Sequence, residues 1–62
     1  MFQVFYHEGS IIIMNDDTEK TRLLNEQETE ILFTENPLLN PLKEKRTIRV
    51  MLDDIHGIKE LP

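Results

Sequence analysis

The sequence predicts a small α+β domain in which one short helix packs on an antiparallel sheet. Three observations indicate this fold class: a pair of strand-like segments around a Gly-containing turn, a capped helix in mid-chain, and an alternating strand near the end. A chain of 62 residues has room for one domain, so we treat residues 1–62 as a single unit with a tail at 58–62 that frays. The alternative fold is an all-β small barrel, which follows if residues 29–34 form a strand.

The first two strands are expected at residues 2–6 and 11–14, joined into a β-hairpin by the four residues 7–10. The alternation of the first strand places Phe5 opposite its apolar neighbours, so we expect an exposed aromatic ring there. The second segment reads Ile-Ile-Ile-Met, and such an uninterrupted apolar run is typical of a strand covered on both faces. A short third strand is expected at residues 21–24, whereas a helix opened by a capping box from Asp16 to Glu19 is the competing interpretation.

A helix over residues 26–35 is predicted from local signals. Asn25 is a good N-cap, Glu28 stands three residues later as a capping box requires, and Pro37 ends the run. The apolar residues 31–33 are consecutive rather than spaced three and four apart, so the amphipathic signal is weak. This weakness leaves the barrel alternative open.

The rest of the chain predicts a crossover and a closing strand. Two Asn-Pro pairs within residues 36–41 restrict the backbone, and we expect Leu38 and Leu39 to pack beneath this stiff connection. Residues 47–52 alternate in the way a half-buried strand does, with one apolar face made of Ile48, Val50 and Leu52. Residues 53–57 are expected to form a turn or a single helical turn.

Composition and charge exclude several classes of protein. The net charge of −5 is uneven: residues 1–42 hold eight acidic and two basic residues, and residues 43–62 hold four acidic and five basic residues. There is no cysteine for a disulfide or a thiolate metal site, and the two glycines are too far apart for a phosphate-binding loop. No apolar run approaches the roughly 20 residues of a membrane span. We expect a soluble, cytoplasmic protein without a cofactor.

Neither catalysis nor metal binding is indicated. Ser10 is the single serine and lies with His7 in the predicted hairpin turn, where no third group orients them as a nucleophile and a base. The one local cluster of candidate metal ligands, residues 53–56, lacks a helical ligand spacing. We therefore expect that the protein is not an enzyme and holds no metal.

Two segments resemble known DNA-binding families. Residues 46–54, Arg-Thr-Ile-Arg-Val-Met-Leu-Asp-Asp, resemble the DNA-reading strand of ribbon-helix-helix repressors, which implies that Thr47, Arg49 and Met51 face the major groove. Residues 24–37 resemble the first helix of winged-helix regulators, a capped helix that ends at Asn-Pro. The first resemblance lacks the two helices that must follow, and in the second Glu35 stands where that family packs a leucine. We assign the chain to neither family.

The remaining interpretation is a small, acidic, non-catalytic protein-binding module that occupies a basic surface on a larger protein. By compositional analogy it is similar to inhibitor and accessory proteins of phages and mobile elements. The candidate contact residues are Phe5, Asp16, Asp17, Glu19, Glu26, Glu28 and Glu30. A purely solubilising role for these acidic residues is the alternative.

The competing function is a dimeric nucleic-acid-binding regulator that uses the basic segment 43–49. Its candidate residues are Lys43, Lys45, Arg46 and Arg49. The negative net charge disfavours nucleic acid as a partner. A homodimer is a further expectation, because so short a chain buries a small core on its own.

Overall fold

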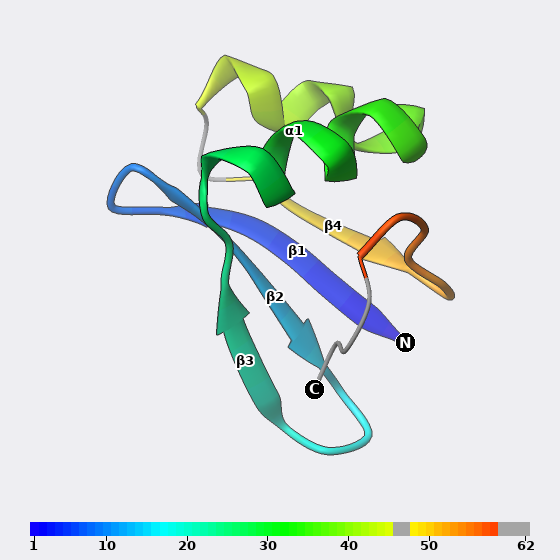
Figure 1. Cartoon of the computed structure of the whole chain (residues 1–62). Coiled ribbons are helices and arrows are strands. Elements are labelled where there is room, and N and C mark those ends of the chain that lie inside the picture. The colour runs from blue at the N-terminus through cyan, green and yellow to red at the C-terminus, as the bar shows by residue number, and fades with distance from the viewer. Residues whose placement is uncertain (46–47, 59–62) are drawn as a thin grey trace.

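The fold is a four-stranded antiparallel sheet with two helices on one of its faces (Figure 1). The computed structural model describes residues 1–45 and 48–58. The strand order is β3-β2-β1-β4, and the sheet is open, with β3 and β4 at its edges. The strands are β1 (Phe2–His7), β2 (Ser10–Asn15), β3 (Lys20–Leu23) and β4 (Arg49–Leu52). The α+β fold class is thus confirmed, and the barrel alternative is wrong.

The first three strands form a meander with tight turns. β1 and β2 extend further than expected and leave a loop of Glu8 and Gly9, which have φ angles of 47° and 86°. Positive φ at both residues is typical of the two-residue turn that matches the twist of a hairpin. At the next turn the Asn15 side chain accepts a hydrogen bond of 2.9 Å from the backbone N–H of Asp17. β3 follows, so the helix proposed from Asp16 is wrong.

The helix α1 (Glu26–Glu35) has the predicted bounds, and its capping box is present. The Asn25 side chain accepts a hydrogen bond of 2.8 Å from the Glu28 N–H, and the Glu28 carboxylate accepts one of 3.3 Å from the Asn25 N–H. Each bond satisfies a backbone donor that the first turn leaves without an intrahelical partner. Residues within one turn therefore stabilise the start of this helix.

The crossover is a second helix, the 3₁₀ helix η1 (Pro37–Glu44), which the sequence reasoning missed. With three residues per turn, Leu39 and Leu42 fall on the same side, and both are buried. Leu38 lies on the other side and is 74% exposed, so the expectation that it packs beneath the crossover is wrong.

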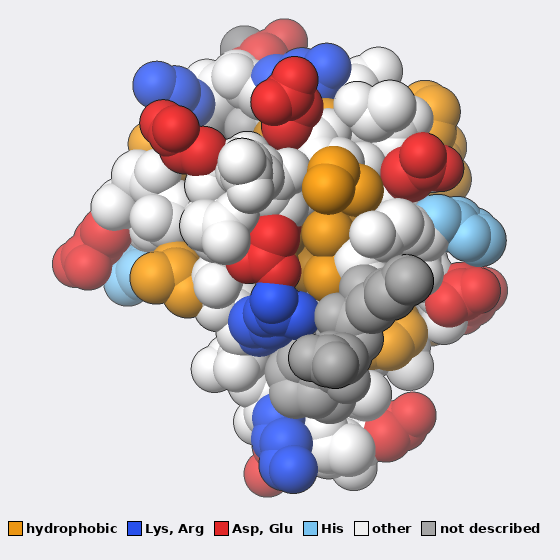
Figure 2. All heavy atoms as spheres, viewed as in Figure 1, with side chains coloured by type: hydrophobic (Ala, Val, Ile, Leu, Met, Phe, Trp, Pro, Cys, Tyr) orange, Lys and Arg blue, Asp and Glu red, His pale blue; other side chains and the backbone are white. Residues whose placement is uncertain are grey.

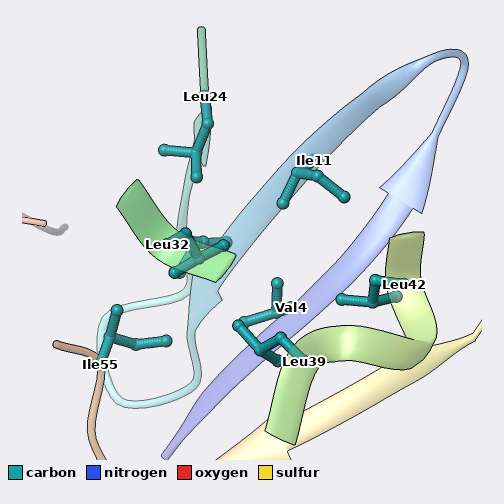
Figure 3. Close-up of a cluster of buried hydrophobic side chains, with 8 residues drawn as sticks. Val4, Ile11, Leu24, Leu32, Leu39, Leu42 and Ile55 are labelled. Carbon is teal, nitrogen blue, oxygen red and sulfur yellow. The ribbon is translucent and has the colours of Figure 1, made fainter. Parts of the chain in front are cut away.

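The core lies between the sheet and the two helices. Figure 3 shows its side chains pointing toward one another from β1, β2, α1, η1 and the segments beside them. The buried residues are Val4, Ile11, Ile13, Leu24, Leu32, Leu39, Leu42 and Ile55. The predicted apolar face of the closing strand is confirmed, because Ile48, Val50 and Leu52 pack against this core.

The segment after β4 is irregular rather than helical, and Asn36 fastens it to the end of α1. The Asn36 Nδ2 donates to the carbonyls of Leu32 and His56 at 2.8 and 3.0 Å, and its Oδ1 accepts from the His56 N–H at 3.1 Å. Ile58 packs against the core and is therefore not a frayed end. Residues 59–62 of the predicted tail, and residue 47 of the predicted strand together with its neighbour Arg46, lie outside the described residues.

Candidate functional site

One face of the sheet carries no helix (Figure 1). Val4 of β1 and Ile13 of β2 are cross-strand partners, and both are fully buried on the helix side. Because successive side chains of a strand point to opposite faces, the residues next to them in sequence point away from the helices. We call this outward surface the open face; its strand residues are Gln3, Phe5, His7, Ser10, Ile12, Met14, Thr21, Leu23, Arg49 and Met51.

Two rows of cross-strand neighbours run over all four strands of the open face. The first row is Arg49, Phe5, Ile12 and Leu23, and the second row is Met51, Gln3, Met14 and Thr21. Leu23 at the β3 edge is 62% exposed, and Met51 at the β4 edge is 46% exposed. The outward face of a solvated antiparallel sheet is usually polar. Here large apolar side chains extend from one edge to the other.

Arg49 is the charged residue of the open face. Its guanidinium carbon lies 5.1 Å from the centroid of the Phe5 ring, within the range of a cation–π interaction. Of the open-face residues, all of which the structure describes, no other carries a formal charge at pH 7 when His7 is neutral. The strand residues of the face are therefore uncharged except for one cation near the β4 edge, although the whole chain has a net charge of −5.

The expectation that residues 11–14 are covered on both faces is wrong for the described chain. Ile11 and Ile13 are buried on the helix side, whereas Ile12 and Met14 lie half-buried on the open face. Phe5 points to this face, as predicted, but its ring is half-buried rather than exposed, because Arg49 lies over it. The sequence reasoning missed its apolar neighbours, and the uninterrupted apolar run of β2 was the available signal for Ile12 and Met14.

The acidic residues proposed as one contact surface lie at opposite ends of β3. Asp16, Asp17 and Glu19 belong to the β2–β3 turn, whereas Glu26 begins α1 after β3 has returned along the sheet (Figure 1). Four strand residues at about 3.4 Å each separate the two groups by roughly 14 Å. Figure 2 shows acidic side chains scattered over the visible face with basic ones among them. The structure does not gather these acidic residues into one patch.

Two of these carboxylates are engaged within the fold. Glu28 belongs to the cap of α1 and forms an ion pair with Arg22 of β3. Asp16 accepts a hydrogen bond from the Gln3 side-chain amide, which ties the β2–β3 turn to β1. Asp17 is exposed, with its Oδ2 at 3.9 Å from the N-terminal amino group. The Glu28 carboxylate therefore has a structural task that competes with partner binding.

A groove of about 530 Å³ lies between the β1–β2 hairpin, the start of α1 and the end of η1. Glu26 and Glu30 line it from α1, and Lys43 and Lys45 line it from the end of η1. The Lys43 Nζ lies 5.5 Å from the centroid of the Phe33 ring, which also lines the groove. Residues from the two rival charged sets therefore meet here, and their formal charges balance.

The basic residues proposed for nucleic-acid binding are divided between two sides of the molecule. Lys43 and Lys45 line the groove on the helix side, whereas Arg49 lies on the open face. Arg46 lies outside the described residues. Affinity for nucleic acid grows with the number of phosphates that a protein neutralises together. The described members of this set point in two directions and do not form one such surface.

His7 and Ser10 are cross-strand partners beside the hairpin turn. The His7 Nε2 lies 3.8 Å from a carboxylate oxygen of Glu8, and both of these side chains are largely exposed. Within the described residues no hydrogen bond joins the Ser10 hydroxyl to the imidazole. Activation of a serine requires a base within hydrogen-bond reach, held by a third group in a site that excludes water. His7 and Glu8, both exposed, and the half-buried Ser10 do not have that arrangement.

Among residues 1–45 and 48–58, no three His, Asp or Glu side chains are placed to hold a metal ion. Over the same part of the chain, no helix has the length and apolar content needed to cross a membrane. Comparison with protein-family models, curated proteins and solved structures gives no match. Function is therefore inferred from the geometry of this chain alone.

Proposed function

We propose that this chain is a non-catalytic protein-binding module that binds another polypeptide through its open face. The observation that supports the proposal is the exposure of Leu23 and Met51 at the two sheet edges, with Phe5, Ile12 and Met14 between them. A contiguous exposed apolar patch on a small protein is characteristic of an interaction surface. The proposal keeps the binding role inferred from the sequence and moves the contact from the acidic residues to the face around Phe5.

The chemistry of this face defines what it can bind. Phe5 lies near the middle of the first row and has the large, rigid ring that often dominates binding energy at interfaces. Arg49 covers part of that ring, so a partner must pair its charge or leave it at the rim in contact with water. The complementary surface is therefore apolar, with a carboxylate placed to meet Arg49.

The test is capture from a lysate of the source organism by the tagged chain, with and without nuclease. The variant Leu23→Lys places a charge on the open face, and Leu38→Lys places the same charge on an exposed leucine of η1 as a matched control. We expect the wild type and Leu38→Lys to recover the same protein, including untagged copies of this chain, and Leu23→Lys to recover at least tenfold less. Equal recovery by all three would refute the assignment of the open face.

The same assay tests the acidic-docking hypothesis. Charge reversal at Asp16, Asp17 and Glu19 leaves the open face intact, so we expect capture to persist. If this variant loses the partner while Leu23→Lys retains it, the contact lies at the β2–β3 turn and the open-face assignment is wrong.

Nucleic-acid binding is the competing proposal, and the division of the described basic residues between two sides weakens it. Partners that disappear on nuclease treatment would favour it. So would an affinity for B-DNA whose log–log salt slope is about −0.9 per phosphate contacted. Lys43→Glu with Lys45→Glu would then reduce that slope by roughly two such increments.

A further inference from the structure

We propose that the polypeptide bound by the open face is a second copy of this chain, in a two-fold dimer whose sheets pack face to face. The inference rests on the proposed function, because it names the partner of the same surface. It is drawn from the order of the open-face residues along and across the strands. That order makes the face complementary to itself.

The two rows of the open face can cover each other in such a dimer. Consider a two-fold axis that lies in the plane of the interface, runs perpendicular to the strands and passes between the two rows. This axis places each strand over the same strand of the other copy, running in the opposite direction. The first row of one copy then covers the second row of the other: Ile12 lies over Met14, Phe5 over Gln3, and Arg49 over Met51. Packing of this kind places the sheets about 10 Å apart, and the flexible methionine side chains can fill the space between them.

β4 and the residue that follows it carry opposite charges that the dimer can pair. Arg49 and Met51 point to the open face, and Asp53 is the next residue in the same alternation and is exposed. Arg49 of one copy, lying over Met51 of the other, is displaced from Asp53 of that other copy by about 7 Å along the strand and by the sheet spacing of about 10 Å, so the two backbones lie roughly 12 Å apart. Extended arginine and aspartate side chains that reach toward each other span this distance together. The arrangement therefore pairs each Arg49 with a carboxylate at the rim, twice by symmetry.

Net charge favours this surface over the others for self-association. Two copies with a charge of −5 each repel one another, and contact at the β2–β3 turn would bring like charges together. None of the described strand residues of the open face is acidic, and the Asp16 carboxylate that reaches this face is hydrogen-bonded to the Gln3 side chain, so contact here brings fewer like charges together than contact at the β2–β3 turn. A partner with a basic surface, by contrast, gains nothing from this face.

The available area sets the expected strength. Four strands about 4.8 Å apart, each about 14–20 Å long, make a face of roughly 300–400 Å² in projection. With the relief of the side chains, each copy buries roughly 500 Å², or about 1,000 Å² in total, at the lower limit of a specific interface. The area of roughly 500 Å² that each copy buries is about a tenth of its accessible surface of 4386 Å². We therefore expect a dimer that dissociates in the micromolar range.

The experiment is sedimentation equilibrium of the full chain from about 1 µM to 1 mM. The wild type is expected to shift from the monomer mass of 7.4 kDa toward twice that mass as concentration rises. Leu23→Lys should weaken association at least tenfold, and Leu38→Lys should leave it unchanged. The charge pairing is tested by exchange: Arg49→Glu and Asp53→Arg should each weaken the dimer, and the double variant should restore it.

Several outcomes would overturn the dimer. These are a wild type that stays monomeric at 1 mM, a dimer indifferent to Leu23→Lys, and a double charge exchange that does not restore association. A monomeric wild type that still captures a protein, and loses it in Leu23→Lys, would refute the dimer while supporting the proposed function. A monomer whose capture is unaffected by Leu23→Lys would refute both.

Discussion

Replacement of Asn36 by alanine tests whether this one side chain holds the segment after β4 in place. Asn36 is 6% exposed and makes three hydrogen bonds, two of them to the backbone of His56. At a net value of about 1 kcal/mol per bond, reduced where water reaches the exposed His56, the loss is about 2–3 kcal/mol. A domain of 62 residues is expected to have roughly 3–9 kcal/mol in total, so Asn36→Ala removes a large share of the stability.

The assay is urea unfolding followed by far-UV circular dichroism, at a concentration low enough that association does not add to the stability. The urea concentration at the midpoint of unfolding should fall, with little change in the slope of the free energy of unfolding against urea concentration. The melting temperature should fall by roughly 10–20 °C. The matched control is Asn40→Ala, because Asn40 also precedes a proline but is exposed. If the two variants differ by less than about 0.5 kcal/mol, the hydrogen bonds of Asn36 do not stabilise the fold as argued.

Two further pairs of variants test the packing, both by the same unfolding assay. Gly57→Ala should lower the free energy of unfolding by about 2–3 kcal/mol, because φ is +84° and the added Cβ would lie 2.7 Å from the Cγ of Glu35. Gly9→Ala, at φ +86° with open space around it, should lower it by about 1 kcal/mol. Equal losses would contradict the predicted clash. Leu32→Ala should lower the free energy of unfolding by about 2–5 kcal/mol, because the side chain is fully buried, whereas Leu38→Ala should change it by less than about 0.5 kcal/mol. A small loss at Leu32 would mean that the surrounding core residues repack to fill the cavity.

Elements defined by neighbouring residues were predictable from the sequence. The helix α1 has the expected bounds because Asn25 and Glu28 satisfy its first backbone donors within a single turn. The hairpin follows from strand formers around Gly9, and the inward face of β4 follows from simple alternation. These features depend on chemistry within a few residues, where sequence reasoning is strongest.

Features that depend on distant residues were not predictable in this way. Asn36 was interpreted as the boundary before a proline, and its role as a bridge requires His56, which follows much later in the chain. Pro37 was interpreted as ending the helix and Pro41 as part of a stiff crossover, but both lie within η1, because the fixed φ of proline also suits a 3₁₀ helix. The sequence alone does not show that no helix covers the outward face of β2.

The structure separates charged residues that are close together in the sequence, for a geometric reason. Asp16 to Glu30 are close in sequence and were treated as one acidic surface. A strand between two segments carries them apart by its full length, and β3 does so here. Lys43 and Arg49, also close in sequence, lie on different sides because η1 and β4 belong to different layers.

The position of β1 between β2 and β4 has a consequence for the order of folding. β1 pairs with β2 across a two-residue loop, whereas its other edge pairs with β4, where Val4 meets Val50 near the far end of the chain. Because the meander is made of local contacts, we expect it to form before β4 pairs with β1, which requires closure of the longer path through α1 and η1. In native-state hydrogen exchange we therefore expect the amides of β4 to open in smaller, more frequent events than those of β2, and each such opening briefly leaves the central strand as an unpaired edge.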